Sequence, residues 1–234
     1  MRTRRWIIVA AVTVTLVAAA TVGLAVGAPV VAAAACPQCY GLSEIADGVY
    51  ADRDDDAYRR MLDAADRRIS TFYGGRVSDP RVLICSTSEC YRRLGGGGEK
   101  GRALGRWSLM LAPAGANEVI ATHELAHAEL HERLGSAASD VPDWFDEGLA
   151  VLISDDERYL RPESEADRCL LPWEEALPVV GADWAAATRD LNDRSYLQAA
   201  CVVSRWVSEQ GGSEAVLRLV DDLQAGRKPP SAPW

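Results

Sequence analysis

The chain has 234 residues, of which 34 are Asp or Glu, 25 are Lys or Arg and only three are His. This length suits one domain of ordinary size with an appended segment, and it argues against several large domains. The net charge of −9 becomes −12 once the three arginines of residues 1–35 are set aside, because that segment holds no acidic residue. Such an acidic body is a poor electrostatic partner for nucleic acid, so no nucleic-acid partner is expected. With 48% hydrophobic residues the chain can still bury a core, which excludes intrinsic disorder for most of it.

The N-terminal segment, residues 1–35, predicts export. Residues 2–5 (RTRR) precede an uncharged stretch from Trp6 to Ala35 that is rich in Ala, Val, Leu and Ile. A basic start followed by an apolar run is typical of a signal peptide or a membrane anchor. We therefore expect a single-pass protein with its body outside the cytoplasm, or a protein secreted after cleavage near residues 33–35. A lipid-modified Cys36 and a buried soluble helix are the remaining interpretations.

All six cysteines follow this segment, and an even number in an exported domain favours disulfides. The CxxC pair at the start of the body could form a redox site or half of a zinc knuckle. No second CxxC is present, and no thioredoxin-like unit surrounds the first, so a structural disulfide is favoured. Of the fifteen possible pairings, we expect Cys36–Cys39, Cys85–Cys90 and Cys169–Cys201.

The first half of the body predicts short strands and helices. Residues 36–56 are acidic and turn-rich, which is typical of a tether. Apolar residues then follow the spacing of one helix face over residues 57–73. Residues 81–85 (RVLIC) predict a strand, and Ser86 with Glu89 predicts a capping box that opens a helix to about Leu94. Residues 102–112 predict one further strand.

Helical patterns dominate after Pro113. Asn117 can cap a helix that runs to Leu134, with Gly135 as its stop. Further helices are expected at about 142–154, 193–210 and 213–225, with an irregular segment at 155–192 and a flexible tail at 227–234. The sequence thus predicts an α+β domain over 57–226, in which a small N-terminal sheet precedes a mainly helical C-terminal part.

All three histidines lie within the helix predicted at 117–134, which contains an HExxH motif at residues 123–127. Four residues advance a helix by about 400°, so His123 and His127 project from nearly the same face. Both imidazoles can then reach one Zn²⁺ ion at about 2.0–2.1 Å. Glu124 points roughly 100° away from His123, where it can hold a water and accept its proton. Two packed core histidines are the alternative.

A catalytic zinc needs a third protein ligand, and Glu147 in the segment DWFDEGLA is the candidate. The turn at 135–142 can bring this second helix back across the first. Asp146 is a rival ligand, but adjacent helical residues point about 100° apart, so one of the two should be selected. Asp146 could instead accept a hydrogen bond from a ligating histidine, and Glu147 could be an exposed carboxylate near a helix start.

The segments HELAHAELHERLG and VPDWFDEGLAVLIS together resemble the gluzincin metallopeptidases of the peptidase MA-like group. The resemblance implies a zincin-like domain in which His123, His127 and Glu147 bind zinc and Glu124 is the general base. It also implies that the strand at 102–112 is the edge strand along which a peptide aligns. Tyr196 resembles a tyrosine that begins a late helix in short proteins of this group and could stabilise an oxyanion. A tyrosine that anchors its helix is the alternative.

These features predict a zinc metallopeptidase that acts on a peptide or protein substrate outside the cytoplasmic membrane. His131 continues the histidine row by four residues and is expected to be exposed, or else to donate a proton at the rim of the site. Two other functions stay open. One is a membrane-tethered zincin-fold module that binds or regulates without turnover, and the other is a zinc amidase acting on a cell-wall component.

Overall fold

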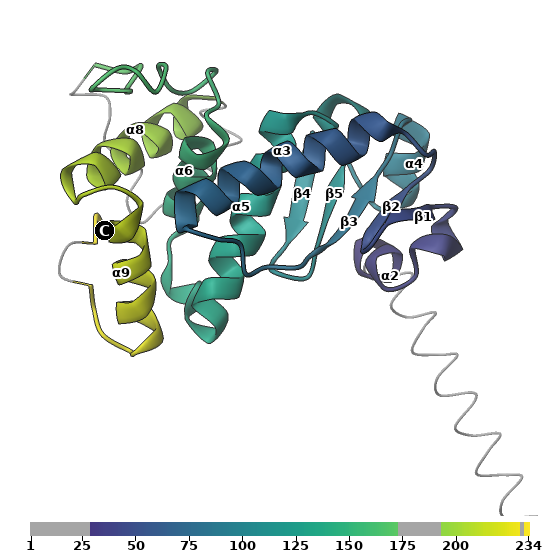
Figure 1. Cartoon of the computed structure of the whole chain (residues 1–234), viewed down its shortest axis with the longest axis horizontal. Coiled ribbons are helices and arrows are strands. Elements are labelled where there is room, and N and C mark those ends of the chain that lie inside the picture. Colours follow the sequence, from purple (N-terminus) through teal and green to yellow (C-terminus); the bar gives the residue numbers. More distant parts are fainter. Residues whose placement is uncertain (1–28, 173–192, 230–231) are drawn as a thin grey trace, which may run out of the picture.

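The computed structural model describes residues 29–172, 193–229 and 232–234. In this part of the chain, a five-stranded mixed sheet is combined with helices, so the fold is α+β as predicted (Figure 1). The strands lie in the order β1-β2-β3-β5-β4. Their bounds are β1 Ser43–Ala46, β2 Val49–Ala51, β3 Arg81–Ile84, β4 Gly101–Leu104 and β5 Ser108–Leu111. β2, β3 and β5 run parallel, whereas β1 and β4 pair antiparallel at the two edges.

The helices precede, connect and follow these strands. Their bounds are α2 Pro29–Ala35, η1 Pro37–Tyr40, α3 Asp56–Tyr73, α4 Ser88–Arg93, η2 Pro113–Gly115, α5 Glu118–Leu134, η3 Gly135–Asp140, α6 Asp143–Ser154, α8 Asp193–Glu209 and α9 Ser213–Gln224. The helices expected at 57–73, 117–134, 142–154, 193–210 and 213–225 are therefore present within one or two residues of their predicted ends. Residues 173–192 of the expected irregular segment, and 230–231 of the tail, lie outside the described residues.

The central strands are buried on both faces, because side chains alternate between the faces along a strand. On one face, Val82 and Ile84 of β3 join the main core together with α3 and α5. On the other face, Leu83 and Met110 pack in a second cluster with α4 and Ala33 of α2. This double cover fixes α5 beside the sheet, where it contacts β4 and β5.

The expected single strand at 102–112 is instead the hairpin of β4 and β5. Residues 105–107 form its turn, and Gly105 has a φ of +54°, in a region that few residues other than glycine adopt. The apolar pattern does not show this break, because both strands carry similar residues. As a result, β4 becomes the free edge of the sheet.

Two expectations about the N-terminal part are wrong. Residues 36–56, expected to be a tether, contribute β1 and β2 to the sheet. The expected single-pass membrane location is contradicted as well, because none of the described helices is long and apolar enough to cross a bilayer. Residues 29–35 form the short helix α2, whose small Ala33 is fully buried in the second core cluster. The rest of the expected segment, residues 1–28, lies outside the described residues.

The three expected disulfides, Cys36–Cys39, Cys85–Cys90 and Cys169–Cys201, are present. The expected capping box is not, because the N-cap of α4 is Thr87, whose hydroxyl accepts the N–H of Cys90 at 3.1 Å. Ser86 instead binds Asp52 through both its N–H and its hydroxyl.

Of the C-terminal helices, α8 packs against α6 and α9 contacts α5. Gly148 of α6 allows α8 to approach closely, since a Cβ added there would lie 2.5 Å from the carbonyl oxygen of Ala199. This crossing fixes the helix that carries Asp146 and Glu147.

Candidate metal centre

Helix α5 holds the HExxH motif rigidly because both of its ends are well defined. The side chain of Asn117 accepts the N–H of Ile120 at 3.1 Å, and Gly135 ends the helix with a φ of +57°. Glu118 in the first turn and Arg133 in the last turn carry the charges that a helix dipole favours at those ends. The turn η3 then reverses the chain, and α6 packs against α5.

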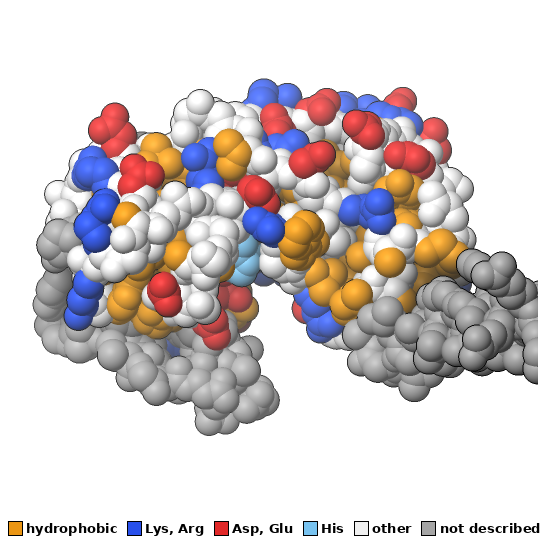
Figure 2. Space-filling model, turned by 90° about the horizontal axis from the view of Figure 1, so that it is seen from below, with side chains coloured by type: hydrophobic (Ala, Val, Ile, Leu, Met, Phe, Trp, Pro, Cys, Tyr) orange, Lys and Arg blue, Asp and Glu red, His pale blue; other side chains and the backbone are white. Residues whose placement is uncertain are grey.

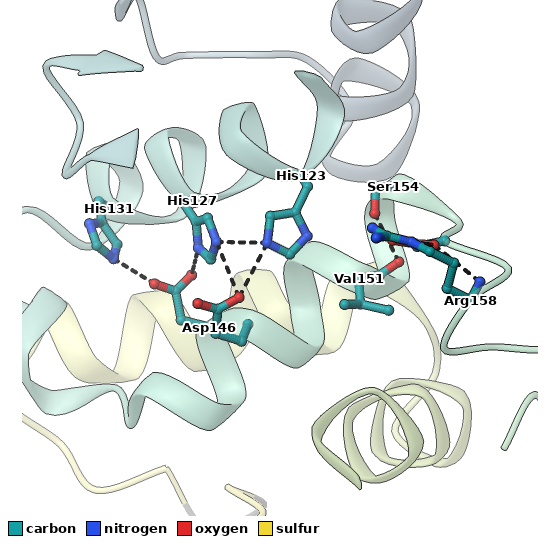
Figure 3. Close-up of polar contacts among 9 residues, drawn as sticks. His123, His127, His131, Asp146, Val151, Ser154 and Arg158 are labelled. Carbon is teal, nitrogen blue, oxygen red and sulfur yellow. Dashed lines mark hydrogen bonds and ion pairs between the residues drawn. The ribbon is translucent and has the colours of Figure 1, made fainter. Parts of the chain in front are cut away.

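His123 and His127 of α5 (Figure 3) lie together with Glu147 of α6. The two Nε2 atoms are 3.1 Å apart, and the Oε2 atom of Glu147 lies 3.2 Å from that of His123 and 3.6 Å from that of His127. Ligand atoms about 2.0–2.1 Å from a tetrahedral zinc are separated by about 3.3–3.4 Å, so the three donors have the spacing that this ion requires. Their chemistry also fits, since two imidazoles and one carboxylate leave the fourth position for water or substrate.

Asp146 is excluded from this ligand set because it contacts the other side of His127. Its Oδ1 atom lies 2.7 Å from Nδ1 of His127, and its Oδ2 atom lies 2.8 Å from Nε2 of His131 (Figure 3). These two adjacent residues of α6 therefore have different positions: Glu147 faces the Nε2 atoms of His123 and His127, and Asp146 orients the ring of His127. His131 is half-buried by these contacts, with 30% of its side chain exposed.

The carboxylates of Asp146 and Glu147 favour a positive charge, a protonated imidazole or a metal ion, between them. Burial alone would lower the pKa of His127, but Asp146 and Glu147 outweigh it and hold this pKa well above the ordinary value. Burial would raise the pKa of Glu147, but His127 and His123 hold it at about 2. Glu147 is therefore ionised at neutral pH, the state in which a carboxylate binds a metal.

Glu124 lies in the same pocket, with only 7% of its surface exposed. Burial raises its pKa, against the lowering effect of His123 and His127, and the backbone N–H of Ala103 donates a hydrogen bond to it. Gly101 of β4 leaves space for this carboxylate, because a Cβ there would lie 2.6 Å from Oε1 of Glu124. A raised pKa makes this carboxylate a better proton acceptor than an ordinary glutamate.

The pocket has a volume of about 340 Å³ and extends along the free edge of β4. Figure 2 shows histidine surface beside a hollow between the two halves of the molecule. The carbonyl of Lys100, just before β4, accepts the N–H of Ala112, just after β5. Because hydrogen-bonded pairs alternate along antiparallel strands, the backbone groups of Gly101 and Ala103 then point away from β5. Both residues line the pocket.

Five pocket residues on or beside β4 were not identified individually from the sequence: Glu99, Gly101, Arg102, Ala103 and Gly105. Glu99 pairs with Arg102 at 2.8 Å and accepts the hydroxyl of Tyr91. A charged pair that flanks a glycine at the start of a strand is the only sequence signal for this wall of the pocket.

Tyr196 of α8, the candidate for stabilising an oxyanion, also lines the pocket. Its ring stacks on that of Tyr159 with centroids 5.4 Å apart. Burial, with Glu147 as the next cause, raises the pKa of its phenol, so the hydroxyl keeps its proton and can donate it to a hydrogen bond.

No protein-family model, no curated protein and no solved structure matches this chain.

Proposed function

We propose that the protein is a zinc-dependent metallopeptidase with a zincin-like domain. The observation that carries this proposal is the tetrahedral spacing of the three donor atoms of His123, His127 and Glu147 in a pocket that also holds the buried Glu124. The three disulfides support action in an oxidising compartment outside the cytoplasm.

Each of these pocket residues has a separate role in the proposed hydrolysis. His123, His127 and Glu147 would hold the ion, and bound zinc would supply Lewis-acid activation of water and of the scissile carbonyl. Glu124 accepts the proton of the attacking water and returns it to the leaving amine. The Tyr196 hydroxyl donates a hydrogen bond to the oxygen on which negative charge develops.

The free edge of β4 supports a peptide as the substrate. An extended chain can pair with the outward N–H and C=O of Gly101 and with the C=O of Ala103, whose N–H already binds Glu124, and this pairing places the chain over the candidate metal centre. A compact amide without an extended backbone would leave these groups unused, so the edge favours a peptidase over a cell-wall amidase.

The test compares the full chain with its Glu124→Gln variant after loading with zinc. We expect the wild type to bind one zinc and to cleave peptides from a quenched-fluorescence library, with loss of cleavage on chelation. Glu124→Gln should keep the zinc and lose roughly 10²- to 10⁴-fold in rate. Glu118→Gln, an exposed change on the same helix, should leave both zinc binding and rate unchanged.

Other outcomes point to the other functions. Equal cleavage by Glu124→Gln would remove this residue from the proton-transfer role. One bound zinc without cleavage of any peptide would favour a binding module, and release of amine from a cell-wall polymer in its place would favour an amidase.

A further inference from the structure

We propose that His131 is a positioning residue for the metal centre, which acts by fixing the carboxylate that orients His127. This role rests on the proposed zinc site and adds an outer layer to it. The three histidines of α5 then have two functions: His123 and His127 face the ion, and His131 holds Asp146.

The contacts of Asp146 define the order of this layer. Each oxygen of its carboxylate binds one imidazole, Oδ1 at 2.7 Å from His127 and Oδ2 at 2.8 Å from His131. A proton on Nδ1 of His127 donates to Oδ1, which leaves the lone pair of Nε2 directed toward Glu147 and the ion. The rotation of one carboxylate therefore determines the orientation of a ligand ring.

The geometry of α5 explains why a third histidine can reach the same carboxylate. His127 and His131 are four residues apart, so their side chains lie one above the other on one face of the helix. Asp146 stands opposite both of them at the start of α6 (Figure 3). The bridge needs both imidazoles, because a carboxylate bound at one oxygen alone is free to turn about its terminal bond.

Exposure indicates which member of the bridge faces solvent. The side chain of His131 is 30% exposed, against 16% for Asp146 and 11% for His127. His131 therefore lies outermost and shields the Oδ2 atom of Asp146 from water. Gly105 of the β4–β5 turn lies next to it, since a Cβ there would be 3.8 Å from its Nδ1 atom.

The test measures zinc affinity by competition with a chromophoric chelator, in the full chain. Replacement of outer residues that orient a ligand typically costs 10- to 100-fold in metal affinity. We expect His131→Phe to weaken zinc binding about tenfold by this route. His131→Gln should restore it to within about threefold, because a glutamine amide can donate to Oδ2. Glu132→Gln, the neighbouring change with 37% of the side chain exposed, should have no effect.

Two further readouts separate positioning from a general loss of structure. The visible spectrum of the cobalt-substituted chain should change with His131→Phe and return with His131→Gln. The metal-free variants should keep the wild-type circular dichroism spectrum and a single cooperative melting transition. If His131 acts through Asp146, then His131→Phe should add little to the loss caused by Asp146→Asn, so the two effects should not be additive.

The outcomes distinguish this proposal from the proposed function. Wild-type zinc affinity in His131→Phe, or full additivity with Asp146→Asn, overturns the role of His131 and leaves the zinc site intact. Failure of the unmodified chain to bind zinc overturns both.

Discussion

Gly101, which faces the proposed general base Glu124, gives a sharp prediction. A methyl group at residue 101 would lie 2.6 Å from Oε1 and 2.7 Å from Cγ of Glu124. Because ordinary contacts begin near 3.4 Å, the carboxylate must move by roughly 0.8 Å. A misplacement of about 1 Å in a catalytic site can cost roughly 10²-fold in rate. Gly101→Ala should therefore lower kcat/KM about 30- to 100-fold, or about 2–3 kcal/mol of transition-state stabilisation.

The assay is peptide cleavage by the zinc-loaded chain, together with zinc affinity and melting temperature. The three nearest contacts of the new methyl group are all with the Glu124 side chain, so the fold and the zinc affinity should be retained. Gly98→Ala is the matched control, since a Cβ there meets nothing within 4 Å. Wild-type cleavage by Gly101→Ala would refute the reasoning, because Glu124 would then not occupy this position during turnover.

Three further predictions concern the oxyanion donor, the charges and the disulfides. Tyr196→Phe should lower kcat roughly 100-fold and leave zinc affinity unchanged; an unchanged kcat would mean that the phenol only anchors its helix. Without metal, the Glu147 carboxylate stabilises the fold above about pH 4.5, and this stabilisation is lost as pH falls toward about 2. Protonated His127 stabilises the fold below about pH 6.5, and this stabilisation is lost as pH rises through the raised pKa of His127. The melting temperature in chelator should thus peak between about pH 4.5 and 6.5. Glu147→Gln should make the acid limb of this curve shallower but not remove it, because His127 and His131 also hold the pKa of the buried Asp146 carboxyl well below its usual range. Replacing the Cys169–Cys201 pair, which spans 32 residues, with serine should cost about 2 kcal/mol more in unfolding free energy than replacing the Cys36–Cys39 pair, which spans three; equal losses in denaturant titrations would contradict the loop-entropy argument.

The helical part of the fold could be predicted from local signals. Asn117 and Gly135 mark the ends of α5 because capping depends on residues within one turn. Closeness in the sequence also favoured the disulfides Cys36–Cys39 and Cys85–Cys90, whereas no local signal pairs Cys169 with Cys201, which lie 32 residues apart. The strands in residues 36–56 were not predicted because β1 and β2 have only four and three residues, and β1 is mostly exposed. β2 also pairs with β3, which is about 30 residues away in the sequence.

The metal centre was predictable as far as one helix extends. The spacing of His123 and His127 follows from helix geometry alone. The choice between Asp146 and Glu147 required the position of α6 relative to α5, which depends on tertiary packing such as the crossing at Gly148. The contact between His131 and Asp146 is not visible in the sequence for the same reason.

X-ray absorption at the zinc edge, on the full chain loaded with one equivalent of zinc, tests the central claim most directly. The account predicts two imidazole nitrogens and at least one carboxylate oxygen at about 2.0–2.1 Å, with no sulfur scattering. Sulfur ligands, a third imidazole, or an unaltered spectrum in the His123→Ala/His127→Ala double variant would contradict it.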